Sequence, residues 1–274
     1  MTATTVSPAP VTSVALTAPT RQPPVLPNLL RSEWAKVRSV RSTYWSLAAA
    51  AVVMIGYGAI NSAPHAGAGH GSSDPILTSL SGVLLAQLAI GVLGVLVITT
   101  EYSTGVIRAS LLAVPRRLKM LTAKSLVFAG LLIVVAEVVV FGSFFIGAAI
   151  LHSHVPVSLG DHNVTRALVG SGLYLTVLGL FSLAIGAIIR HTAGAITTAI
   201  GVVFVLPILS GLLPGSWGAH VNGYLPVQAG ELIGQQHPPA GGDVLSAWQG
   251  FGVFCLWTAV LLVIAGYLLQ RRDA

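Results

Sequence analysis

One acidic residue stands alone in a long apolar stretch. Glu137 lies near the middle of the run 125–151, which has no other charge. A carboxylate at the centre of a bilayer costs at least about 2.5–3.5 kcal/mol, so Glu137 must face the protein interior and find a partner or a proton. Gln87, Thr176 and Thr258 lie in other apolar runs and could pair with it. Glu137 is a candidate polar point on a path across the membrane. The alternative is a hydrogen bond between helices, worth about 0.6–2 kcal/mol.

Histidine pairs could introduce metal chemistry. His152 and His154 are separated by one residue, a spacing compatible with a metal site. Few carboxylates lie nearby, and the surrounding loops are rich in glycine. We therefore interpret these histidines as polar loop residues and predict no metal site.

Motifs of catalysis are missing from the sequence. Lys124-Ser125 would need glycines at positions 118 and 123 to form a phosphate-binding loop, and it has Leu118 and Ala123. No C-x-x-C, H-E-x-x-H or G-x-S-x-G motif occurs. The lone Cys255 excludes an intrachain disulfide. We predict no catalytic residue and no cofactor held by this chain.

The elements that position these residues must be membrane helices. Hydrophobic residues make up 54% of the 274 residues and charged residues only 8%, against roughly 25% charged in a soluble domain. So few charges cannot supply a polar shell, and a chain this apolar is not disordered. A helix crosses a bilayer with about 20 residues. The predicted fold is an all-α integral membrane protein with six transmembrane helices, at 44–62, 76–100, 125–151, 167–189, 192–213 and 248–269.

The basic residues indicate the orientation. Cytoplasmic loops of membrane proteins are enriched in Lys and Arg. Arg166 alone lies in the loops 63–75, 152–166 and 214–247, and the other 13 of the 14 basic residues lie on the opposite side. This distribution predicts that both termini are cytoplasmic. The net charge of +6 therefore reflects membrane orientation rather than binding of nucleic acid.

Three segments outside the spans have predicted features of their own. Residues 1–27 are rich in proline and predict a disordered cytoplasmic tail. Residues 28–43 predict a basic helix at the membrane interface, with Leu30, Trp34 and Val37 on one face, or an anchor that only orients the first span. The outer loop 214–247 predicts one or two short helices that dip into the membrane.

Small and cyclic residues inside the spans affect helix geometry. The pairs Ser143/Gly147 and Ser182/Gly186 permit close approach of neighbouring helices, which we interpret as packing. Pro207 removes one backbone hydrogen bond and predicts a kink in the fifth span.

The segment after the second span, 101–124, is the most informative. Glu101 lies at the membrane exit, and Gly105 allows a sharp turn. Residues 106–114 can form a short helix that ends at Pro115. A short cytoplasmic helix held between two long spans can act as a lever that transmits force to both. The alternative is an interfacial loop whose arginines bind anionic headgroups.

Several residues resemble a known family. The spacing of Glu101, Gly105, Leu111, Pro115 and Arg117 resembles the E-x(3)-G … L … P-x-R pattern of ABC-2 type permeases, the membrane subunits of ATP-binding-cassette transporters. The resemblance covers about residues 28–274, and Val106 departs from it where many members have Thr. Further segments resemble the actinobacterial branch, namely 33–43, 190–194, 224–226 and 271–273.

The resemblance implies a function and partners. The segment 28–43 would be an elbow helix, and 101–124 would be a cytoplasmic coupling loop that docks on a separate ATPase. Two copies of that ATPase would hold ATP and Mg, and a second permease chain, identical or different, would complete the path across the lipid bilayer. The protein would be an exporter of an amphipathic or drug-like molecule in the bacterial cytoplasmic membrane. The implied coupling residues are Glu101, Gly105, Arg108, Leu111, Pro115, Arg116 and Arg117.

Two other function classes stay open on the sequence alone. A secondary carrier or channel would use Glu137 as a proton-linked site, although we find neither the internal repeat nor the paired broken helices common in such proteins. A membrane enzyme or sensor would have to use the outer histidines.

Overall fold

The chain folds into a bundle of long helices. The computed structural model describes residues 26–39, 41–65, 75–105, 117–151, 159–214, 216–237 and 245–271. Six helical segments within these ranges are long and apolar enough to cross a membrane: Thr43–Ser62, Val83–Ser103, Arg117–Leu151, Val164–Ile189, Thr192–Gly211 and Ala247–Arg271. The predicted all-α integral membrane fold is confirmed.

Helix α7 (Val164–Ile189) occupies the centre of the bundle. It packs against α4 (Val83–Ser103), α6 (Arg117–Leu151) and α12 (Ala247–Arg271). Its large side chains, such as Tyr174, Leu178 and Leu183, are almost completely buried. Helix α2 (Arg41–His65) packs against α4 and α6 on another side. The apolar residues of α7 are therefore covered by protein rather than lipid.

Small residues bring these helices close together, as predicted. A Cβ atom added to Gly94 of α4 would lie 2.4 Å from the carbonyl oxygen of Gly179 on α7. One added to Gly186 would lie 2.7 Å from Ile98. At the other predicted pair, Ser143 of α6 donates a hydrogen bond to the carbonyl of Ser79 at 2.8 Å. Glycine and serine at these positions let the backbones approach to near contact.

The second predicted span is divided in the structure. The short helix α3 (Pro75–Ser79) precedes a turn, and α4 begins only at Val83. The hydroxyl of Ser81 donates to the carbonyl of Thr78 at 2.8 Å, which competes with a continuous helix. Gly82 lies directly against Met54 of α2, where an added Cβ would be 2.0 Å from the carbonyl oxygen. The close contact with α2 therefore explains why the helix is interrupted at this point.

Other boundaries also differ from the predicted ones. The N-terminal helix α1 (Leu26–Ser39) ends before residue 43, and α2 begins at Arg41. Helix α6 begins at Arg117, eight residues before the predicted span, so the basic residues up to Lys124 are helical. The apolar run marks where a helix can lie in lipid, and the helix itself continues beyond it.

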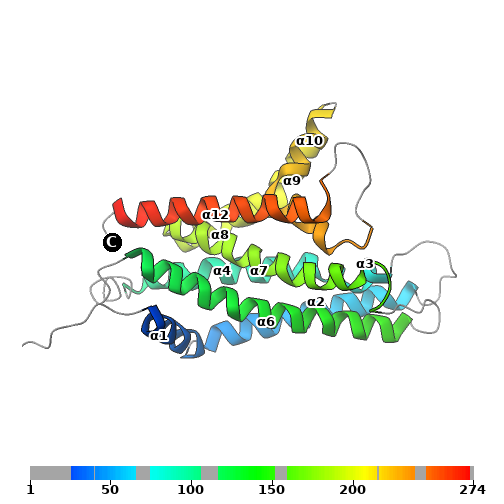
Figure 1. Ribbon diagram of the computed structural model, residues 1–274, viewed down its shortest axis with the longest axis horizontal. Helices are drawn as coiled ribbons and strands as arrows, with labels where there is room; N and C mark the ends of the chain where they lie inside the picture. Colours follow the sequence, from blue (N-terminus) through cyan, green and yellow to red (C-terminus); the bar gives the residue numbers. More distant parts are fainter. Residues whose placement is uncertain are drawn as a thin grey trace, which may run out of the picture.

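The fifth span changes its winding near Pro207. Helix α8 (Thr192–Ile200) leads into a π-helical turn (η1, Gly201–Val205), which is followed by α9 (Leu206–Gly211). The backbone N–H of Leu206 donates a hydrogen bond to the carbonyl of Gly201, five residues earlier in the sequence. A proline has no N–H and its ring crowds the preceding turn, and the wider turn relieves that conflict. Helices α9 and α10 (Ser216–Tyr224) lean away from the bundle (Figure 1).

The predicted short helices between spans five and six are present. Helix α11 (Pro226–Glu231) and a 3₁₀ turn (η2, Leu232–Gly234) follow α10 and pack between α7 and α12. Ile233 is fully buried, and its carbonyl lies where a side chain on Gly170 would be. Arg166 of α7 donates to the carbonyls of Gln235 and Gln236 at 2.7 and 3.1 Å. These contacts fix the segment to the bundle.

The described chain begins and ends at the same end of the bundle. Figure 1 shows α1 and the C-terminal end of α12 together there, with α3 at the opposite end. Arg117, at the start of α6, donates to the carbonyl of Leu269 on α12 at 3.0 Å. We call the end that holds α1, Arg117 and Arg271 the basic end.

Candidate functional site

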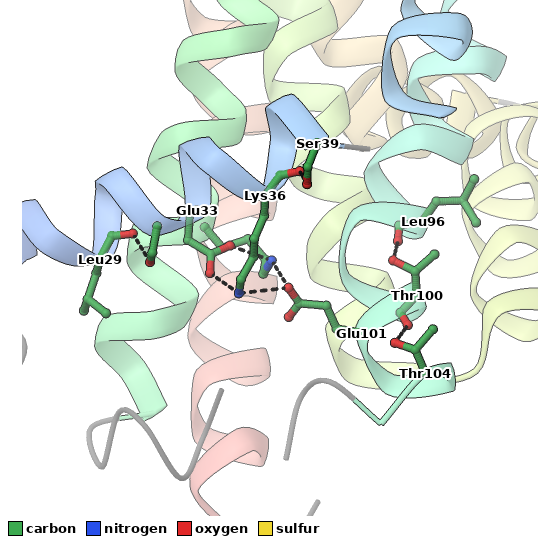
Figure 2. Close-up of polar contacts among 10 residues, drawn as sticks. Leu29, Glu33, Lys36, Ser39, Leu96, Thr100, Glu101 and Thr104 are labelled. Atoms are coloured by element: carbon green, nitrogen blue, oxygen red, sulfur yellow. Dashed lines mark hydrogen bonds and ion pairs between the residues drawn. The ribbon is translucent and has the colours of Figure 1, made fainter. Parts of the chain in front are cut away.

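Four charged side chains meet at the basic end. Glu33 and Lys36 come from α1, Glu101 from the last turn of α4, and Lys124 from the start of α6. The Lys124 ammonium lies 2.8 Å from Oε2 of Glu33 and 2.7 Å from Oε1 of Glu101. Lys36 completes the ring, 2.5 Å from Glu33 and 3.3 Å from Glu101. Figure 2 shows Glu33 and Lys36 of α1 facing Glu101 of α4. We call these four residues the charge cluster.

The charge cluster is electrically balanced and largely buried. The side chains of Glu33 and Lys124 are each 6% exposed, that of Glu101 is 11% exposed, and only Lys36 is well exposed, at 37%. Breaking a buried ion pair by removing one partner leaves an uncompensated charge and costs about 3–5 kcal/mol. The geometry therefore holds the three helices in one arrangement.

The protonation states follow from these contacts. Burial alone would raise the pKa of Glu33, but the ammonium groups of Lys124 and Lys36 outweigh burial and hold this pKa below its usual value. Burial alone would lower the pKa of Lys36, but its hydrogen bond to Glu33 and the charge of Glu101 raise it above the usual value. Both groups are thus ionised around neutral pH.

Helix α1 packs against the bundle through a face other than the apolar one predicted for the membrane interface. Leu29 and Glu33 are its buried residues, and Leu29 packs against Ala123 of α6. Trp34, on the predicted apolar face, is 45% exposed. The protein-facing side of α1 therefore carries the ion pairs, and the tryptophan side is left for the surroundings.

The last turn of α4 and the turn at Gly105 lead into the predicted coupling segment. Thr100 and Thr104 donate to the carbonyls of Leu96 and Thr100, at 2.7 Å each, and cover the last turn (Figure 2). Gly105 has a φ of 72°, in the left-handed region where glycine has no steric penalty. The sharp turn predicted at Gly105 is present. Among the described residues, Oε2 of Glu101 is buried without a hydrogen-bond partner.

The remaining predicted coupling residues divide into two groups. Arg117 lies at the start of α6 and bonds to Leu269, so it joins α6 to α12 rather than to the charge cluster. The predicted short helix 106–114 and the residues Arg108, Leu111, Pro115 and Arg116 lie outside the described residues. Of the three predicted coupling residues that the structure describes, Glu101, Gly105 and Arg117, only Glu101 belongs to the charge cluster.

Arginine contacts also stabilise the hairpin between α7 and α8. The guanidinium carbon of Arg190 lies 5.3 Å from the centroid of the Tyr102 ring, in the range of a cation–π contact. Its Nη2 donates to the carbonyl of Leu268 at 3.2 Å. Arg190 adopts a φ of 59°, which is uncommon for a residue with a side chain. The hairpin is thus joined to the ends of α4 and α12.

Glu137 lies apart from the charge cluster. It is thirteen residues beyond Lys124 on α6, about 20 Å along the helix axis. Its carboxylate lies against Gly172 of α7, where an added Cβ would be 2.5 Å away, and its Oε2 has no hydrogen-bond partner among the described residues. The structure therefore gives Glu137 a position between α6 and α7.

The suggested partners of Glu137 bind elsewhere. The side-chain amide oxygen Oε1 of Gln87 accepts a hydrogen bond from the hydroxyl of Tyr174 at 2.5 Å. Thr176 donates to the carbonyl of Gly172 on its own helix at 2.9 Å, and Thr258 donates to that of Phe254 at 3.0 Å. Side chains that satisfy their own helix backbone are poor partners for a distant carboxylate.

The sequence comparison identifies the family. A family model described as "ABC-2 family transporter protein" matches residues 24–274. The chain belongs to this family. It is therefore the membrane-embedded permease of an ATP-binding-cassette transporter, a type of transporter that works with an ATPase partner. No curated protein matches the permease.

Three members of the charge cluster were not predicted as site residues. Glu33, Lys36 and Lys124 each looked like ordinary charged residues beside a membrane span. The spacing of Glu33 and Lys36, one helical turn apart, was a visible sign of one ion pair. Glu33 and Lys124 are 91 positions apart in the sequence, so no local sequence pattern indicates their contact.

Proposed function

We propose that the permease exports an amphipathic or drug-like molecule and that ATP hydrolysis on a separate subunit drives it through the segment 101–117. The observation that supports this proposal is the charge cluster. Glu101 and Lys124 stand on either side of the proposed coupling segment, and their side chains are 2.7 Å apart. Both also contact residues of α1.

The charge cluster suggests how a push on the coupling segment is transmitted. A displacement of that segment would move the end of α4 and the start of α6 as one unit, because the Glu101–Lys124 pair joins them. Helix α1 would follow through Glu33 and Lys36. Buried paired charges resist sliding, since any separation leaves an unpaired charge in a poorly hydrated place.

The proposed assembly follows the family resemblance. Two ATPase copies would bind ATP and Mg and contact the coupling segment, and a second permease chain, identical or different, would complete the path. The abundance of basic residues at the basic end supports a cytoplasmic location for that end and for both termini. The bacterial cytoplasmic membrane is the membrane we expect. Export is the direction that the resemblance implies.

The proposed substrate class rests on an apolar cavity between α7, the fifth span and α12. Its volume is about 310 Å³, at the lower end for small-molecule sites. Phe181, Val202 and Trp257 are among its lining residues, which are almost all apolar. Such a surface suits the apolar part of an amphipathic molecule.

The test is recovery of the transporter from its native membrane. A tagged permease should co-purify with an ABC ATPase, identified by mass spectrometry, and the complex should show vanadate-sensitive ATP hydrolysis. Gly105→Val should uncouple hydrolysis from transport in proteoliposomes, because a β-branched residue does not tolerate a φ of 72°. Gly130→Val is the matched control, since Gly130 faces open space on α6. Equal coupling in both variants would reject the lever.

Glu137 is a second proposed element of the transport path. Its unpaired Oε2 and its contact with Gly172 support a polar point between α6 and α7. Glu137→Gln should change the rate of ATP-driven transport or its pH dependence in proteoliposomes. Unchanged transport and pH profile would assign Glu137 to packing, and transport driven by a proton gradient without ATP would favour a secondary carrier.

A further inference from the structure

A second cavity lies at the end of the bundle opposite the charge cluster. Its volume is about 180 Å³. It is bounded by α3, the start of α4, α7 and the α11–η2 segment. Leu77 and Leu84, which are 65% and 53% exposed, form an apolar rim. Tyr174 and Glu231 supply the polar part of the lining. The cavity thus has an apolar mouth and a carboxylate in its wall.

Among the residues that the structure describes, Glu231 has hydrogen-bond partners but no cation beside it. The hydroxyl of Tyr174 lies 3.3 Å from its Oε1, and the side chain of Gln87 also hydrogen bonds to it. Glu231 forms no ion pair with another described residue, and the ion pairs of the charge cluster lie at the other end of the bundle. A carboxylate can accept about four hydrogen bonds, so capacity remains for a donor in the cavity.

The surroundings of Glu231 favour a positive guest. Burial raises the pKa of its carboxyl, and the hydrogen bonds from Tyr174 and Gln87 offset this only in part. A cation within about 4 Å would restore the ionised form. Arg166 does not fill this role, because its Nη2 is bound to the carbonyls of Gln235 and Gln236 and the residue does not line the cavity.

We propose that this cavity binds the ammonium head of a small amphiphile, with Glu231 as its counter-ion and Leu77 and Leu84 against its alkyl chain. A volume of about 180 Å³ equals roughly six waters at about 30 Å³ each. That space holds an ammonium group and a few carbons, and the rest of the chain extends past the apolar rim. The site belongs to the permease chain alone and does not depend on the proposed ATPase coupling.

Binding of hexylammonium to the purified full-length permease in neutral lipid nanodiscs tests the proposal. Neutral hexanol is the matched probe, because it keeps the chain and lacks the charge. A hydrogen bond to a charged group contributes about 1.5–3 kcal/mol, so hexylammonium should bind Glu231→Gln about tenfold more weakly than wild type or worse. Hexanol should bind both proteins equally. Asp161→Asn, which neutralises an exposed acid that does not line the cavity, should bind hexylammonium like wild type.

Each alternative outcome overturns the proposal. Equal binding of hexylammonium to wild type and Glu231→Gln would exclude Glu231 as the counter-ion. Equal loss in Asp161→Asn would indicate a general effect of negative charge on the protein rather than a contact in the cavity. Hexanol binding as tightly as hexylammonium to wild type would show an apolar cavity without charge selection. Size-exclusion chromatography and thermal unfolding confirm that each variant is folded. Co-purification of an ATPase would be unaffected by any of these results.

Discussion

The ammonium of Lys124 lies 2.7 Å from the carboxylate of Glu101 and so joins the first turns of α6 to the last turn of α4. The proposed coupling segment, 101–117, begins at Glu101 and ends seven residues before Lys124. A contact at the base of a loop fixes the position of both its ends, whatever the loop itself does. Lys124 also contacts Glu33, so helix α1 shares the same anchor.

Replacing Lys124 should release this anchor. Lys124→Met keeps most of the side-chain volume but leaves Glu33 and Glu101 with Lys36 as their only cation in the charge cluster. We expect a loss of about 3 kcal/mol, the lower end of the range for a broken buried pair, because Lys36 still compensates in part. Denaturant unfolding of the purified permease measures the loss.

Lys119→Gln provides the control for this substitution. Lys119 lies on the same part of α6, is partly exposed and has no ion pair in the structure as described. Its replacement should change stability by less than about 0.5 kcal/mol. Equal destabilisation by both variants would mean that a general loss of positive charge, and not the buried pair, is responsible.

Acid should undock α1. The pKa of Glu33 lies below its usual value of 4.5, so its contribution to stability is complete above about pH 4.5 and is lost as the pH falls through the lowered pKa. The pKa of Lys36 lies above 10.5, so its contribution persists up to that pH and is lost as the pH rises further. The docked state should therefore persist between these limits.

Spin labels can follow this transition. Cysteines would be introduced at the exposed residues Ser32 of α1 and Thr122 of α6, in a Cys255→Ser background. Spin labels on these two cysteines would report the distance between α1 and α6. The distance distribution should be narrow near neutral pH and broaden in acid while the bundle stays folded. A distribution that is equally narrow in wild type and in Glu33→Gln near neutral pH would contradict the role assigned to Glu33.

Tyr102 should stabilise the hairpin between α7 and α8 through its ring. Tyr102→Leu removes the cation–π contact with Arg190 and should cost about 0.5–2 kcal/mol, while Tyr102→Phe keeps the ring and should cost less. Thermal unfolding of the two variants gives the comparison. If leucine and phenylalanine behave alike, the ring contributes no specific attraction.

Gly94 and Gly130 should respond in opposite ways to alanine. A Cβ on Gly94 would lie 2.4 Å from the carbonyl oxygen of Gly179, so Gly94→Ala must separate α4 from α7 at a cost of about 1–3 kcal/mol. Gly130 has nothing within 4 Å of such an atom, and Gly130→Ala should be neutral or stabilise the helix by up to about 1 kcal/mol. Denaturant midpoints of the two variants decide between close packing and general helix propensity.

Most of the fold followed from the pattern of apolar runs. Six runs gave six spans, because the length of a membrane helix is set by the thickness of the bilayer. The turn at Gly105 and the close contacts of Ser143 and Gly186 also followed from residue type. The break before Gly82 did not, because it depends on how closely α2 approaches, which is a tertiary property.

The candidate site was predicted only in part. Glu101 was found because its position at the end of a span fits a family pattern. The partners of Glu101 were missed because ion pairs between distant segments depend on which helices become neighbours. Glu231, 57 residues from Tyr174, was missed for the same reason, since it ends the short helix α11, whose packing on α7 the sequence does not reveal.

The order in which the ribosome makes the chain gives the charge cluster a further meaning. Glu33 is synthesised 91 residues before Lys124, and Glu101 23 residues before it. At about 5–20 residues per second, α1 waits roughly 5–20 seconds for its main partner. Until Lys124 is made, Lys36 is the one ammonium of the charge cluster that has been synthesised for its two carboxylates. The ion pair that docks α1 on α6 can therefore form only after the residues of the proposed coupling segment have been synthesised, and a chain that stops before Lys124 lacks this pair.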